Sequence, residues 1–107
     1  MFRTSAVLLG LAVLAAPAFA DPGPDEGSAL YEARCKMCHG SGLANAPLID
    51  KLATLENDKI VDALTNPVPM MASVVGGLTE EDKRNIAVFL TKKPMPAKDG
   101  LPAVDAE

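Results

Sequence analysis

Apolar residues recur at helical spacing in three stretches of the chain, and each stretch predicts an α-helix. The first begins near residues 25–28, where acidic side chains suit a helix N-terminus, and it runs into residues 35–39. The second covers residues 57–65, with Asn57 as its expected cap and Pro67 just beyond its end. These two stretches predict a helical framework on either side of a region without periodicity.

The third stretch predicts the last helix. Thr79, followed three residues later by Asp82, is similar to a capping box with Asp in place of the usual Glu or Gln. Two lysines suit the C-terminal end, and Pro94 stops the helix. The expected buried stripe consists of Ile86, Phe89 and Leu90. Residues 43–52 look mostly like loop, because their spacing is irregular and a proline interrupts them.

The two ends of the chain differ from its centre. Arg3, an apolar run and the Ala18-Phe19-Ala20 sequence have the order of a secretory signal peptide, with cleavage expected after Ala20. A membrane anchor is the alternative, but the run is short and a cleavage site follows it directly. The chain thus divides into a signal peptide (1–20), a flexible leader (21–26), one domain (27–93) and a flexible tail (94–107).

Both cysteines and the single histidine lie in one pentapeptide, Cys35-Lys36-Met37-Cys38-His39. This C-x-x-C-H spacing is the one at which c-type haem is attached. Two thiols on adjacent turns can each add to one vinyl group of the same porphyrin, and the next residue can then present an imidazole nitrogen to the iron. We therefore expect one covalently attached haem c per chain, held by Cys35 and Cys38, with His39 as an axial ligand.

Three other sites could use a Cys-x-x-Cys pair: a thiol–disulfide redox site, part of a zinc site, or a short structural disulfide. A structural zinc site needs four ligands, and the chain has no second group of cysteines or histidines. A thioredoxin-like site needs a βαβ context, and no strand-like alternation surrounds the pentapeptide. Haem attachment is the interpretation we favour among these.

A second axial ligand must come from another side chain, and no second histidine exists. A methionine thioether is the natural alternative, because Met/His ligation is usual in electron-transfer haem proteins. Met37 lies inside the pentapeptide and Met95 lies past the last helix, which leaves Met70 and Met71, just after Pro67 and Pro69. In a chain without haem, such a pair would more often fill a hydrophobic core.

A ligating histidine usually donates its other ring N–H to a backbone carbonyl. The carbonyl of Pro47 is the candidate acceptor for His39. The alternative is that Pro47 is an ordinary loop proline.

With these features placed, the chain resembles a small single-domain class I cytochrome c of the bacterial periplasm over roughly residues 27–93. Gly27, Tyr31 and Cys35 repeat at a spacing of four, as in the N-terminal helix of that family. Met71 stands seven residues before Leu78, similar to the family's axial methionine, which favours Met71 over Met70. The resemblance implies an all-α class I cytochrome c fold, in which N- and C-terminal helices cross and one or two short middle helices surround the haem.

What the resemblance implies for function is a periplasmic electron carrier, with Met71 and His39 on the iron and no catalysis by this chain alone. The main alternative is the haem c subunit of a periplasmic oxidoreductase complex that accepts electrons from a flavin or molybdenum subunit. A five-coordinate haem sensor or peroxidase, and a thiol–disulfide oxidoreductase, are further alternatives.

Charge and aromatic content refine this interpretation. After cleavage, 87 residues would remain with nine basic and 14 acidic side chains, a net charge near −5. Nucleic acid and anionic membranes need basic patches, so we expect redox partner proteins instead, and no stable membrane insertion once the signal peptide is removed. Only two aromatic residues, Tyr31 and Phe89, would remain for the core. The apoprotein is therefore expected to be largely unfolded, with burial around the haem driving folding.

Overall fold

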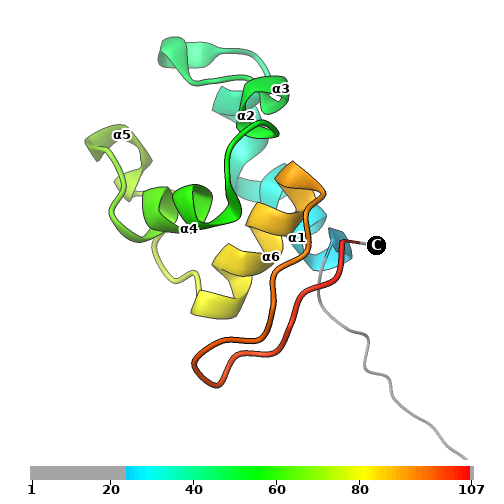
Figure 1. Cartoon of the computed structure of the whole chain (residues 1–107). Coiled ribbons are helices and arrows are strands. Elements are labelled where there is room, and N and C mark those ends of the chain that lie inside the picture. Colours follow the sequence, from blue (N-terminus) through cyan, green and yellow to red (C-terminus); the bar gives the residue numbers. More distant parts are fainter. Residues whose placement is uncertain (1–23, 107) are drawn as a thin grey trace, which may run out of the picture.

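The computed structural model describes residues 24–106, and these form helices joined by short loops, with no β-strand among them (Figure 1). The expected signal peptide and residues 21–23 of the expected leader lie outside the described residues, whereas residues 24–26 of that leader form the first turn of a helix. Within the described part, no helix has both the length and the apolar character needed to cross a membrane. The elements are α1 (Pro24–Leu30), η1 (Tyr31–Cys35), α2 (Lys36–His39), η2 (Leu43–Asn45), α3 (Ile49–Leu52), α4 (Asn57–Thr65), α5 (Pro69–Ala72) and α6 (Glu80–Thr91).

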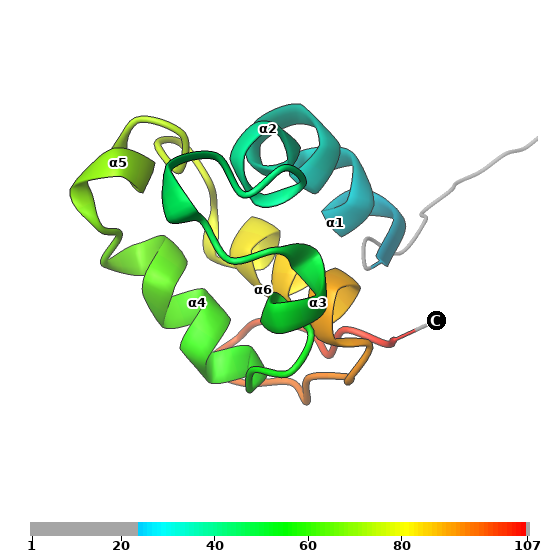
Figure 2. The ribbon, with the colours of Figure 1, turned by 90° about the horizontal axis from the view of Figure 1, so that it is seen from above.

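The first three elements follow one another without a break and form the predicted N-terminal helix. Its middle part, η1, is a π-helical turn, a widened form of helix that is often found at functional sites. The helix crosses α6 (Figure 2), and Gly27 lies at the crossing. A Cβ atom on Gly27 would lie 2.1 Å from the carbonyl oxygen of Asn85, so only glycine permits this approach. Tyr31 and Phe89 pack beside it, with ring centroids 5.6 Å apart.

Helix α4 packs against another side of α6 and has the predicted bounds. It buries Ile60 and Leu64 in the core. The prediction that Asn57 caps this helix is wrong, because Glu56 occupies the cap position and makes no side-chain cap. The Asn57 amide instead donates to the carbonyl of Lys93, at 2.8 Å, and accepts from the Thr91 hydroxyl. Asn57 therefore ties the start of α4 to the end of α6.

Helix α6 begins with the capping box that the sequence predicts. The Thr79 hydroxyl accepts from the backbone N–H of Asp82, and the Asp82 carboxylate accepts from the backbone N–H of Thr79, both at 3.0 Å. The helix ends at Lys92, whose φ of 61° is left-handed. Of the predicted stripe, Ile86 and Leu90 are buried and Phe89 is half-buried. The core thus lies along α6, between the N-terminal helix and α4.

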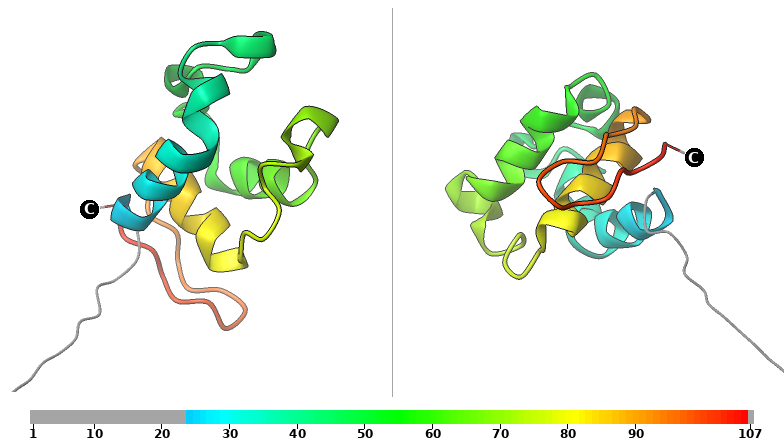
Figure 3. Two further views of the ribbon diagram at one scale, coloured as in Figure 1. Left: turned by 180° about the vertical axis from the view of Figure 1, so that it is seen from behind. Right: turned by 60° about the horizontal axis from the view of Figure 1, so that its bottom comes forward.

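The segment after α6 differs from the expected loose tail. It turns back on itself through two isolated antiparallel bridges, Met95 with Val104 and Lys98 with Leu101 (Figure 3). Met95 and Val104 are 8% and 4% exposed and belong to the core. Arg84 of α6 is buried and donates to the carbonyls of Pro96 and Pro102, the latter at 2.7 Å. We call residues 95–104 the C-terminal hairpin.

Candidate functional site

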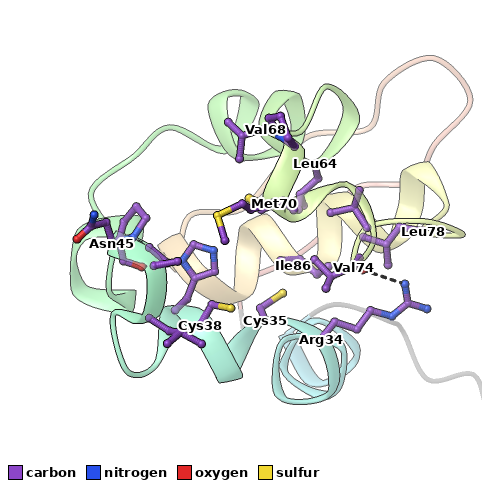
Figure 4. Close-up of a pocket in the computed structure, with 18 residues that line it drawn as sticks. Arg34, Cys35, Cys38, Asn45, Leu64, Val68, Met70, Val74, Leu78 and Ile86 are labelled. Atoms are coloured by element: carbon purple, nitrogen blue, oxygen red, sulfur yellow. Dashed lines mark hydrogen bonds between the residues drawn. The ribbon is translucent and has the colours of Figure 1, made fainter.

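A cavity of about 410 Å³ opens between the end of the N-terminal helix, the 43–47 loop, α4, α5 and the segment before α6 (Figure 4). Its volume lies in the range of cofactor sites. Aliphatic side chains form most of its wall, among them Leu64, Val75, Leu78 and Ile86. The site residues predicted from the sequence all line it: Cys35, Cys38, His39, Met70 and Met71.

The two cysteines are free thiols, and both are half-buried in the cavity wall. Cys35 ends η1 and Cys38 lies in α2, so the helical turn brings both sulfur atoms to the same space (Figure 4). Burial raises the pKa of the Cys35 thiol, which the nearby Arg34 opposes and Cys38 reinforces. A raised pKa keeps this thiol protonated at neutral pH. The structure thus presents two thiols, not a disulfide, to one apolar cavity.

His39 is oriented by a hydrogen bond to the loop that follows it. Its Nδ1 lies 2.7 Å from the carbonyl oxygen of Pro47, which confirms the predicted partner. Because a carbonyl can only accept, Nδ1 carries the proton, and the lone pair of Nε2 is left free. Left-handed backbone at Gly42, Ala44 and Asn45 turns the short loop so that Pro47 reaches the ring. This is the arrangement that metal-ligating histidines use.

The methionine pair lines the same cavity from α5, an element that lies apart from α2, which carries His39 (Figure 1). Pro69 starts this element, and the expected stiff loop is in fact one short helical turn. Met71 is half-buried and packs against the core, whereas Met70 is 72% exposed. Met37, at 77% exposure, and the buried Met95 do not line the cavity. Met70 and Met71 are therefore the methionines that line the cavity, and they are the same pair that the sequence indicates.

Arg34 is a residue of the site that the sequence did not single out. Its Nη1 donates to the carbonyls of Val74 and Gly76, at 3.2 and 2.8 Å, across the mouth of the cavity (Figure 4). These partners lie 40 and 42 positions later in the chain, so no local pattern connects them to Arg34.

The residues present fit a c-type haem. Two thiols at the C-x-x-C spacing, an imidazole with its Nε2 free and two thioethers line one largely aliphatic cavity. Comparison with known proteins decides the family. The family model described as "Cytochrome C oxidase, cbb3-type, subunit III", a c-type cytochrome domain, matches residues 22–90. The chain belongs to this family.

One curated relative of this cytochrome domain is a polyvinylalcohol dehydrogenase from a Pseudomonas species, 31% identical over 87 residues. The match covers 81% of the chain but 13% of the length of that dehydrogenase. No solved structure matches the chain. The family assignment agrees with the all-α fold of the described residues and implies haem binding and haem-based electron transfer.

Proposed function

We propose that this cytochrome domain is a periplasmic carrier of single electrons that holds one haem c. Cys35 and Cys38 would form the two thioether bonds, and His39 and Met71 would ligate the iron. The observation that carries the proposal is the hydrogen bond between His39 Nδ1 and Pro47, which leaves Nε2 free in a cavity that also contains both thiols.

Each residue of the site has a role in this proposal. The haem, when bound, supplies an iron that alternates between the ferrous and ferric states. The Pro47 carbonyl holds the His39 ring in one orientation and one tautomer. The thioether of Met71 would be the second ligand, and a Met/His pair raises the reduction potential of a haem. The aliphatic wall excludes water, so little reorganisation accompanies a change of charge.

Three features support Met71 over its neighbour. Met71 stands seven residues before Leu78. It is half-buried against the core, whereas Met70 is mostly exposed. Its carbonyl accepts from the N–H groups of Val74 and Val75, at 3.0 and 3.2 Å, which fixes the backbone on its C-terminal side.

Visible absorption spectroscopy tests the ligand set. The exported protein, made in cells with haem-attachment machinery, should show sharp α and β bands when reduced. When oxidised, it should show the weak far-red band of a methionine–ferric haem bond. Met71→Ala should abolish the far-red band, and the matched control Met70→Ala should retain it. A high-spin spectrum in the wild type would refute the six-coordinate carrier and favour a haem sensor or peroxidase.

Covalent attachment has a separate test. Haem should stay with the polypeptide on a denaturing gel, and Cys35→Ala together with Cys38→Ala should release it. A wild-type protein that loses its haem under denaturing conditions would contradict the thioether bonds. A protein without haem would leave the thiol–disulfide function as the one to test.

Export is part of the proposal and rests on the sequence. The signal-peptide order of residues 1–20 supports it, as does the attachment pentapeptide. N-terminal sequencing of the mature protein should begin at Asp21.

A redox partner with a neutral or basic docking face would suit the acidic mature chain.

The dehydrogenase relative favours a second candidate, in which the domain serves as the haem c subunit of a periplasmic oxidoreductase complex. Its electrons would come from a flavin or molybdenum subunit. Affinity purification from the native host separates the two functions. A carrier should be recovered alone, whereas a subunit should be recovered with a catalytic chain in fixed stoichiometry.

A further inference from the structure

The segment between α5 and α6 has few contacts that fix its position. Residues 73–77 join the methionine pair to the last helix. A Cβ atom on Gly76 or Gly77 would have no neighbour within 4 Å, so this part of the segment lies in open space. Within residues 24–106, Arg34 is the side chain that donates hydrogen bonds to its backbone. Met71 and Val75 pack against the core, and together with the Arg34 hydrogen bonds this packing resists a movement of Met71 away from the cavity.

Arg34 connects this segment to the helix that carries the attachment cysteines. It directly precedes Cys35 in η1. Its guanidinium donates to Val74, whose own N–H donates to the carbonyl of Met71 at 3.0 Å. The same nitrogen, Nη1, also donates to the carbonyl of Gly76 at 2.8 Å, so the cation bridges two carbonyl dipoles. Hydrogen bonds from a charged donor are stronger than neutral ones.

We infer that Arg34 is a positioning residue that keeps the Met71 thioether on the iron by holding residues 74–76 against the attachment helix. This inference rests on the proposed function, because it needs Met71 to be the ligand. Without the hydrogen bonds from Arg34, residues 74–76 should move outward more readily, and an external ligand should displace Met71 at a lower concentration.

The test is displacement of Met71 by imidazole in the oxidised, haem-loaded full chain, followed by loss of the far-red band. Arg34→Gln should lower the imidazole concentration at half-displacement by about tenfold, the factor that 1.4 kcal/mol represents. The matched control is Lys36→Gln. Lys36 lies on the same helical run, and its Nζ pairs with Glu32 at 3.2 Å. The Lys36→Gln variant, like Arg34→Gln, loses one positive charge, and its imidazole concentration at half-displacement should equal that of the wild type.

A double-mutant cycle separates positioning from a general effect of charge or folding. In the Met71→Ala background there is no thioether to displace and no far-red band to follow, so imidazole binding is read from the shift of the main haem absorbance band. Arg34→Gln should leave that imidazole affinity unchanged. A tenfold effect that persists in that background would overturn the inference. Equal half-displacement concentrations in the wild type and Arg34→Gln would overturn it as well.

Arg34→Lys provides a second variant if Arg34→Gln loads haem poorly. The lysine amine lacks the rigid planar fork of the guanidinium and sits on a more flexible stem, so a shift of about threefold is expected. No shift would count against a positioning role for Arg34. Failure of the proposed function gives a different result. If the wild type itself lacks the far-red band, Met71 is not the ligand and both proposals fall. If the band is present and insensitive to Arg34, only the inference fails.

Discussion

Gly27 is the single residue on which the crossing of the two long helices depends most directly. Gly27→Ala would place a methyl group 2.1 Å from the Asn85 carbonyl and 2.9 Å from the Phe89 Cβ. The helices would have to separate, and we expect a loss of about 3 kcal/mol in the free energy of unfolding of the haem-loaded protein. Denaturant titration followed by circular dichroism measures it. Gly76→Ala is the control, because its Cβ meets nothing within 4 Å, and it should change stability by less than about 0.5 kcal/mol.

At the scale of single residues, the sequence predicted hydrogen bonds between residues close together in the chain and did not predict those between residues far apart in it. The bond from His39 to Pro47 was predictable because a ligating histidine needs an acceptor and a short loop follows it. The roles of Arg34 and Asn57 were not predictable. Their partners lie 40 and 36 positions away, and both residue types are ordinary on helix surfaces and at helix starts.

Among the helices, α6 offers the clearest test of a local signal, because its capping box is complete. Thr79→Ala removes the acceptor for the Asp82 N–H and should lower the free energy of unfolding by about 1 kcal/mol. Thr79→Ser keeps the hydroxyl and should retain most of that stability. If the two variants were equally stable, the side-chain cap would contribute nothing.

The long helices were predictable, whereas the C-terminal hairpin and the short helical turns η2, α3 and α5, in segments expected to be loop, were not. Helices α4 and α6 have strong periodicity and clear stops, so their extents follow from the sequence. The hairpin has only two isolated bridges, too few for any alternation of apolar and polar residues. It is held by Arg84, which looks in the sequence like a surface charge on α6 but is buried.

For the whole molecule, the C-terminal hairpin completes the core. A chain ending at Pro94 would lose the buried side chains of Met95 and Val104 and leave Arg84 without its carbonyl partners. We expect a loss of about 3 kcal/mol or more in the free energy of unfolding, at about 1.5 kcal/mol or more per side chain. A chain ending at Asp105 keeps the hairpin and serves as the control. Equal thermal midpoints for the two chains would refute this role.

The haem should matter as much to folding as to function. The cavity lies against the core and is lined mainly by aliphatic side chains, which the cofactor would cover. The variant with both Cys35→Ala and Cys38→Ala, freed of haem, should therefore show weak, non-cooperative unfolding by circular dichroism. A cooperative transition near that of the haem-loaded protein would contradict this expectation.

The path of the hairpin also brings the two ends of the described chain close together. It returns the polypeptide to the start of α1 (Figures 1 and 3), and none of the residues that line the cavity lies in α1 or in the hairpin. A polypeptide spliced onto either end would leave the cavity mouth uncovered. The domain could thus be tethered to a larger protein at both ends and still exchange electrons with a third one through the open side.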